Sequence, residues 1–188
     1  MILFLDALSF PAYAALFSAD RKILTERRFD CDGRENDVMQ GKLEKLLKDG
    51  KTSWRDLTGI AVVTGPGGFT GTRLVTLMAN SVGWALGTPL YGVDAFDLCE
   101  KSGAPLPHFS RANRNEYVVR ESAGAATSIK RAKELPQGPW TGPGNPLDFT
   151  PQTLIISGID YAQAVRNLDL STPQKRLIPS YAKAPNVS

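Results

Sequence analysis

Residues 59–93 read GIAVVT (59–64), GPGGFTGTR (65–73), LVTLMANSVGWA (74–85) and LGTPLYGV (86–93). The apolar, β-branched run Ile60–Thr64 lies between glycines, which is typical of a buried strand. The glycine-rich residues after it predict a sharp loop, and the next run predicts a helix over Thr70–Leu86 that ends at a Gly-Thr-Pro sequence. Leu90–Val93 predicts a second strand. Together they predict a βαβ unit whose two strands lie parallel in one sheet.

The loop differs from the common phosphate-binding loops. A P-loop ends in Gly-Lys-Ser/Thr, and no lysine follows a glycine here; a dinucleotide fingerprint needs a third glycine where Thr70 stands. Backbone amides at the helix start can hold an anion, but a tight turn without a ligand is the favoured interpretation. We therefore predict a structural loop in which Thr70 caps the helix and Gly67 or Gly68 has positive φ. Its predicted residues are Gly65, Gly67, Gly68, Thr70 and Gly71.

The helix predicted over residues 70–86 is apolar on two sides. At about 100° per residue, one apolar face consists of Leu74, Leu77, Met78, Ser81, Trp84 and Ala85. A second consists of Val75, Ala79, Val82 and Leu86, and the polar stripe is limited to Arg73, Thr76 and Asn80. One apolar face covers the sheet, so the other requires a second helix layer or another protein.

The N-terminal region predicts strands at Ile2–Leu5, Ala12–Phe17 and Arg21–Phe29, followed by an amphipathic helix over Asn36–Lys48. Three meandering strands followed by alternating helices and strands is the order of a ribonuclease-H-like α/β domain. Asp6 closes the first strand with Ser9 nearby, and an aspartate in this position is most often a turn residue that accepts hydrogen bonds from its own backbone.

Residues 65–73 and 86–93 carry a family resemblance. GPGGFTGTR and the later LGTPLYGV closely resemble the TsaB (YeaZ) pattern of Gly-Pro-Gly-Ser-Phe-Thr-Gly-Leu-Arg followed by Ala-Leu-Gly-Ile-Pro-Leu-Val-Gly-Val. The resemblance extends over residues 1–100 and weakens beyond them. It implies the actin/Hsp70-like ATPase fold, in which a ribonuclease-H-like unit occurs twice and an aspartate at the position of Asp6 faces nucleotide phosphates. Here Asp-Ala-Leu-Ser replaces the family's Asp-Thr-Ser, so Asp6 and Ser9 are expected to form at most a vestigial ATP/ADP site.

The resemblance also implies a function. TsaB proteins act in the bacterial machinery that adds threonylcarbamoyl to the adenosine beside the anticodon of certain tRNAs. The implied role is a non-catalytic scaffold that pairs with the catalytic paralogue TsaD, with a TsaE-like ATPase docking on the pair and tRNA contacted only indirectly. Self-pairing in the absence of TsaD stays open. The predicted partner-binding residues are Met39, Leu43, Leu74, Leu77, Met78, Ser81 and Ala85.

The alternative is an active enzyme of the same superfamily: a nucleotide-hydrolysing ATPase, a phosphotransferase or a peptidase. A peptidase needs a zinc pair or an activated nucleophile, and the sequence contains one histidine, His108. A kinase needs an acidic pair around magnesium, and Asp6 is the one plausible candidate. We therefore predict no catalytic residues, no metal site and no required cofactor.

The rest of the chain predicts a smaller second lobe. The 188 residues divide into an N-terminal lobe over 1–102 and a C-terminal lobe over 103–188, expected to be trimmed relative to the family. A hairpin is predicted from strands 116–121 and 127–132, a Pro/Gly-rich irregular segment over 135–151, a strand over 154–157 and a helix over 160–168. Basic residues at 111–133 are interpreted as a solvated strand face rather than an RNA-binding patch.

Composition is ordinary for a globular protein. The net charge of +3 does not by itself indicate nucleic-acid binding. Cys31 and Cys99 have no metal or redox spacing, and two unpaired thiols fit a reducing compartment; a disulfide between them is the alternative. Asp6 interrupts the first apolar run, and no apolar stretch reaches eighteen residues, so neither a signal peptide nor a membrane span is predicted. The expected location is the cytoplasm.

Overall fold

The computed structural model describes residues 1–30, 35–113, 115–135, 141–143 and 158–181. Its strands are β1 (Ile2–Asp6), β2 (Ala12–Phe17), β3 (Ile23–Phe29), β4 (Gly59–Gly65), β5 (Leu90–Asp94), β6 (His108–Arg111), β7 (Glu116–Arg120) and β8 (Ser128–Arg131). Its helices are α1 (Glu35–Asp49), α2 (Phe69–Leu86), α3 (Ala95–Lys101) and α4 (Tyr161–Arg166), with single 3-10 turns η1 (Trp54–Asp56) and η2 (Ala132–Glu134). Cys31 and the predicted strand over 154–157 lie outside the described residues.

The larger sheet has five strands in the order β3-β2-β1-β4-β5. β1, β2 and β3 form an antiparallel meander, whereas β4 lies parallel to both β1 and β5. The predicted βαβ unit is therefore confirmed, with α2 as its crossover helix. Because β1 and β4 are central strands, both of their faces are apolar, as the sequence of β4 indicated.

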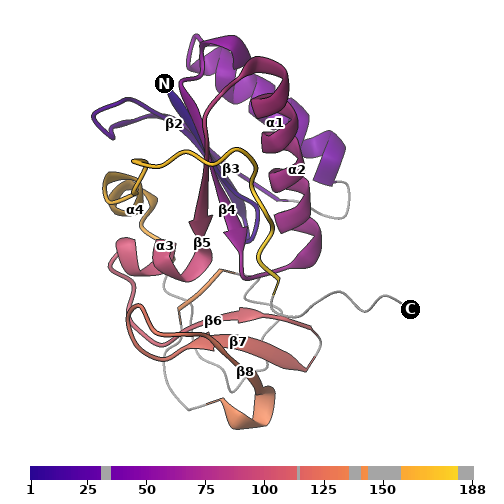
Figure 1. The fold of residues 1–188 in the computed structure, drawn as a ribbon, viewed down its shortest axis with the longest axis vertical. Helices are drawn as coiled ribbons and strands as arrows, with labels where there is room; N and C mark the ends of the chain where they lie inside the picture. Colours follow the sequence, from indigo (N-terminus) through magenta and orange to yellow (C-terminus); the bar gives the residue numbers. More distant parts are fainter. Residues whose placement is uncertain (31–34, 114, 136–140, 144–157, 182–188) are drawn as a thin grey trace.

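Helices cover both faces of this sheet (Figure 1). Leu3 and Leu5 of β1 face the core beneath α1 and α2, while Phe4 between them faces the core beneath α3 and α4. This alternation follows the period of two of a strand. Between the two cores, β1 is buried except at Ile2, and every residue of the neighbouring strands β2 and β4 is buried.

A second, three-stranded antiparallel sheet of order β6-β7-β8 lies beyond α3, at the bottom of Figure 1. The predicted hairpin is confirmed as β7 and β8, with Tyr117 opposite Lys130. Its small core consists of Phe109, Tyr117 and Val119. The exposed pattern of β8 shows that this outer strand contributes little to that core.

Residues 174–180, here called the C-terminal strap, cross over β5 and reach α2 (Figure 1). The Gln174 amide donates to the Leu90 carbonyl (2.8 Å), and the Ser180 amide donates to the Thr64 carbonyl (2.7 Å). Between these points Leu177 is buried in the core beneath α2. The strap thus covers the edge that β5 would otherwise leave open.

Candidate functional site

The α2 helix turns one apolar face to the sheet and the other to the outside. Val75 (1% exposed) and Ala79 pack in the core, whereas Leu77 is 63% and Trp84 90% exposed. Ser81 and Ala85 are exposed between them, and Leu74 and Met78 are half-buried at the side facing α1. The structure therefore assigns Val75 and Ala79 to the chain's own core and leaves the face around Leu77 uncovered.

The polar stripe predicted on α2 is wrong at Thr76. Thr76 is buried, and its hydroxyl donates to the Thr72 carbonyl (2.6 Å), which satisfies the polar group without solvent. Asn80 is instead turned to the strap: its amide nitrogen donates to the Leu177 carbonyl (3.0 Å) and its oxygen accepts from the Leu177 amide (2.8 Å).

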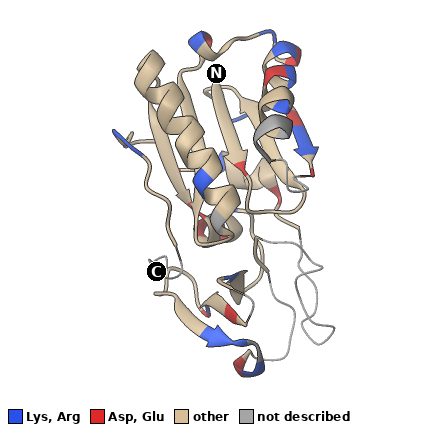
Figure 2. Cartoon of the chain, turned by 90° about the vertical axis from the view of Figure 1, so that its right-hand side faces the viewer, with Lys and Arg blue, Asp and Glu red and all other residues tan. Residues whose placement is uncertain are grey.

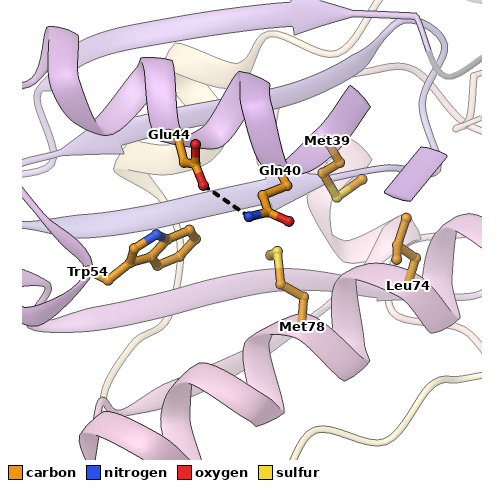
Figure 3. A pocket seen from close by; sticks show the side chains of 6 residues that line it. All are labelled: Met39, Gln40, Glu44, Trp54, Leu74 and Met78. Carbon is orange, nitrogen blue, oxygen red and sulfur yellow. Dashed lines mark hydrogen bonds between the residues drawn. The ribbon is translucent and has the colours of Figure 1, made fainter. Parts of the chain in front are cut away.

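A groove separates α1 from α2 on this outer side (Figure 3). Its volume is about 340 Å³, and the lining residues are Met39, Gln40, Glu44, Trp54, Leu74 and Met78. The side chains of Met39 and Gln40 from α1 point toward Met78 and Leu74 from α2, and Trp54 closes one end. The Gln40 amide donates to the Glu44 carboxylate (3.0 Å), so the polar residues form one edge of an apolar groove.

The structure brings together most, but not all, of the predicted partner-binding residues. Leu43 is completely buried in the core beneath α1, so its assignment to a partner surface is wrong: in the helix it points to the sheet. Met39 is also buried in this core, with 2% of its surface exposed, although it lines the groove, so its assignment to an exposed partner surface is wrong as well. The groove also contains Gln40, Glu44 and Trp54, which were not among the predicted partner-binding residues. Trp54 belongs to a connecting turn outside any helical periodicity, so no local pattern indicated it.

The outer surface of α2 carries almost no charge. Arg73 is the only charged residue of the helix, whereas α1 beside it displays several Lys and Glu residues (Figure 2). We call the exposed surface formed by Gln40, Gly41 and Glu44 of α1 with Leu74, Leu77, Met78, Ser81, Trp84 and Ala85 of α2 the α1–α2 face. An exposed apolar helix surface flanked by polar residues is typical of a protein-interaction site.

Both carboxylate oxygens of Asp6 accept hydrogen bonds from groups of the same chain. One carboxylate oxygen accepts from the backbone amides of Leu8 (2.8 Å) and Ser9 (3.1 Å), and the other accepts from the hydroxyls of Ser9 and Tyr161 (both 2.7 Å). The carboxylate is buried, and the Tyr161 ring stacks on Tyr13 at 3.7 Å between centroids. This arrangement is that of a turn residue. Tyr161 lies 155 positions away, so the sequence carried no signal for this contact.

The glycine loop has a different geometry from the one predicted. Gly68, not Thr70, occupies the N-cap of α2, and no side chain caps the helix there. Gly68 has φ −56°, whereas Gly65 has φ +120°, so the predicted positive φ at Gly67 or Gly68 is wrong. A Cβ on Gly65 would lie 2.1 Å from the Ser180 carbonyl oxygen, and one on Gly71 would lie 2.4 Å from that of Ala7. A Cβ on Gly67 would meet the Leu8 side chain at 2.7 Å.

Arg120 joins the second sheet to α3. Its guanidinium contacts the carboxylates of Asp94 (3.2 Å), Asp97 and Glu100 (3.1 Å) and lies 5.4 Å from the Phe96 ring centre. This buried side chain therefore belongs to no solvated basic face, contrary to its predicted place among the exposed basic residues of this region. Burial raises the pKa of Asp94, an effect that its backbone hydrogen bonds and Arg120 oppose.

His108 is fully buried at the same junction, and its ring stacks against Phe96 at 6.3 Å. Neither imidazole nitrogen has a hydrogen-bond partner within the described part of the chain. Burial lowers the pKa of His108, with Glu100 opposing and Arg120 adding to the effect. The imidazole is therefore neutral at pH 7.

The described residues contain no group of three or more His, Cys, Asp or Glu side chains placed to hold a metal ion. Cys99 is a buried free thiol whose pKa is raised by burial, which keeps it protonated and unreactive. Among the helices that the structure describes, none combines the length and the apolar character needed to cross a bilayer.

Part of the chain is similar in sequence to known proteins. Residues 36–107 match the family model described as "TsaD: tRNA N6-adenosine threonylcarbamoyltransferase". Uncharacterized proteins of Mycobacterium bovis and Mycobacterium tuberculosis are 33% identical over 98 residues, covering 50% of this chain and 46% of theirs. The chain therefore spans about half the length of the curated relatives it matches.

Two solved structures share the fold. A Pseudomonas aeruginosa protein described as similar to the peptidase YEAZ superposes with a TM-score of 0.61, and YeaZ from the same organism with 0.59. Both are 17% identical, and each alignment covers 72% of this chain and 68% of the other. The predicted fold class is confirmed: a mixed five-stranded sheet of the actin-like ATPase fold. Residues 36–107 are thus similar to the TsaD family model and the chain shares the fold of the YeaZ structures, in agreement with the resemblance carried by the motifs at 65–73 and 86–93.

Proposed function

We propose that this chain is a non-catalytic subunit of a tRNA threonylcarbamoyladenosine-forming complex that pairs through its α1–α2 face with a TsaD-type catalytic paralogue. The observation that carries the proposal is the exposed, nearly uncharged outer surface of α2, where Leu77 and Trp84 contact solvent. Large exposed aromatic residues are enriched among the residues that contribute most to the binding energy of protein interfaces.

Packing considerations support a helical partner. Helices α1 and α2 form a two-helix layer whose inner side already covers the sheet, and the α1–α2 face is its outer side. Two helices from a paralogue would complete a four-helix arrangement and bury the outer side. In such an arrangement the groove between α1 and α2 would accept side chains from the partner, as grooves between helix ridges do.

The proposed lack of catalysis is supported by the surroundings of Asp6 and His108, the two residues considered as candidates for chemistry. The Asp6 carboxylate is buried and accepts four hydrogen bonds from its own chain, leaving no accessible oxygen for magnesium or phosphate chemistry in this arrangement. The single histidine, His108, is buried in the junction beside α3. In the complex, the transfer reaction would belong to the TsaD-type subunit, with a TsaE-like ATPase as a further partner.

Affinity measurement with the TsaD-type paralogue of the same organism tests the proposal. Leu77→Gln and Trp84→Gln together should weaken binding about a hundredfold or more, because interface hot spots contribute about 2 kcal/mol each. Their melting temperature should stay close to that of the unmodified chain, since both side chains are exposed. Leu24→Gln with Ile129→Gln is the matched control, because these residues are also exposed and apolar but lie on β3 and β8.

Three results would overturn the proposal. The first is the absence of binding by the unmodified chain, and the second is binding by the folded Leu77→Gln, Trp84→Gln variant that equals that of the control. The third is ATP hydrolysis or phosphotransfer by the purified chain that disappears in Asp6→Asn, which would favour an active enzyme of the superfamily.

A further inference from the structure

Tyr161, the first residue of α4, connects this helix to the end of β1. Its hydroxyl donates to the Asp6 carboxylate (2.7 Å), and its ring stacks on Tyr13, which is opposite Asp6 in the pairing of β1 with β2. The Arg28 guanidinium of β3 lies 5.3 Å from the ring centre, and Tyr161 is buried. Burial raises the pKa of Tyr161, so its hydroxyl stays protonated and able to donate. Tyr161 therefore contacts both strands where their pairing ends.

The loop between β1 and β2 begins directly after Asp6. One oxygen of Asp6 accepts from Tyr161, and the other accepts from the amides of Leu8 and Ser9, so the same carboxylate joins α4 to the first residues of the loop. Ala7 packs against the core beneath α2, whereas Leu8 belongs to the core beneath α4. Because these two helices lie on opposite faces of the sheet (Figure 1), the loop connects the two sides of the molecule.

The first turn of α2 lies directly against this loop. A Cβ on Gly71 would lie 2.4 Å from the Ala7 carbonyl oxygen, so the two backbones are in close contact. Leu74 and Met78 lie about one and two turns beyond Gly71 on the same side of the helix, and both line the groove between α1 and α2. A displacement of the loop would therefore displace the start of α2 and, with it, one wall of the groove.

We propose that Tyr161 is a positioning residue for the α1–α2 face, an inference that rests on the proposed function. Its hydroxyl fixes the Asp6 carboxylate, the carboxylate fixes the start of the loop, and the loop fixes the first turn of α2. Each step is a hydrogen bond or a backbone contact, and such contiguous contacts are able to couple distant sites. Through Tyr161, α4 thus acts on a partner surface to which it does not belong.

Tyr161→Phe tests the inference because it keeps the stacked ring and removes only the hydroxyl. In the free chain, the Thr72 amide donates to the Gly68 carbonyl (3.2 Å) in the first hydrogen bond of α2. Its hydrogen exchange should become about tenfold faster in the variant, because that turn opens more easily once Asp6 has lost its link to α4. Binding to the TsaD-type subunit should weaken about fivefold, the loss expected for about one hydrogen bond.

Two variants are matched controls. Tyr13→Phe removes the hydroxyl of the other ring in the same stack, but that hydroxyl donates to Glu26 of β3 and not to Asp6. Ser9→Ala removes the second 2.7 Å hydrogen bond to the same oxygen of Asp6 and leaves Tyr161 in place. Both should keep the exchange of the Thr72 amide and the binding constant within about twofold of those of the unmodified chain.

The outcomes separate the inference from the proposed function. Equal exchange of the Thr72 amide in Tyr161→Phe and in the unmodified chain would overturn the inference. An equally large increase in Ser9→Ala would also overturn it, because the carboxylate would then need any second donor and not the contact with α4. If Tyr161→Phe binds as tightly as the unmodified chain while the Leu77→Gln, Trp84→Gln variant does not bind, the inference is wrong and the pairing stands.

The exchange measurement does not depend on a partner. If the unmodified chain does not bind the TsaD-type subunit, the proposed function is wrong. Faster exchange of the Thr72 amide in Tyr161→Phe alone would still support the connection from α4 to α2, because it is measured on the free chain.

Discussion

Two glycines, Gly65 at the end of β4 and Gly71 in the first turn of α2, allow the backbone to lie close to other segments of the chain. Gly65 combines φ +120° with a carbonyl oxygen of Ser180 where a Cβ would stand, and Gly71 faces the Ala7 carbonyl. Gly65→Ala and Gly71→Ala should each destabilise the fold by about 1–3 kcal/mol, because neither carbonyl is the end of a flexible side chain. Denaturant unfolding of the two variants measures this effect.

Gly68 is the matched control at the same scale. Its φ of −56° suits any residue, and a Cβ there would meet nothing within 4 Å. Gly68→Ala should therefore cost no more than about 1 kcal/mol, the ordinary disadvantage of alanine at an N-cap. A loss at Gly68 as large as at Gly71 would show that the loop is constrained by something other than these backbone contacts.

The C-terminal strap depends on one side chain of the neighbouring helix. Asn80 of α2 both donates to and accepts from the backbone of Leu177, as a strand partner would. Asn80→Ala leaves both backbone groups of Leu177 without that partner, so we expect a stability loss of about 1–3 kcal/mol. Faster hydrogen exchange of the Leu177 amide should accompany it. Ser81→Ala, on the exposed side of the same helix, should change neither quantity; equal exchange in both variants would contradict the role of Asn80.

At the scale of the whole molecule, the junction between the two sheets should respond to acid through His108. Its folded-state pKa lies below its unfolded value because burial disfavours the charged imidazolium, an effect that the positive charge of Arg120 increases. The unfolded chain therefore binds a proton first as pH falls below about 6.5, the ordinary pKa of histidine. The free energy of unfolding should therefore not depend on His108 above that pH. Below it, this group should lower the free energy of unfolding by at most about 1.4 kcal/mol per pH unit.

His108→Leu removes the titrating group and should flatten the pH dependence between pH 7.5 and 5.5. Asp94 titrates in the opposite sense because its folded-state pKa is raised, but it contributes equally to both proteins and cancels in the comparison. Chemical denaturation at several pH values measures the difference. Parallel curves for the two proteins would show that His108 is not the source of acid sensitivity.

Local pattern alone predicted much of this protein. Residues whose roles depend on near neighbours were predicted correctly: the β-branched run of β4, the apolar periodicity of α2, and the glycine and proline that end it. The motifs at 65–73 and 86–93 likewise predicted the similarity to the TsaD family model and the fold. These signals are local because a strand or a helix is specified by residues within a few positions of one another.

Other features depended on contacts between distant segments. Which apolar face of α2 meets the sheet, the burial of Leu43 and Thr76, and the position of the positive φ at Gly65 follow from packing against β strands and the strap. Tyr161 reaches Asp6, and Arg120 reaches three carboxylates of β5 and α3, across sequence separations that no periodicity spans. The sequence by itself determined the elements and their amphipathic character. Only the tertiary structure decided which faces are covered, because burial depends on what the rest of the chain brings to each surface.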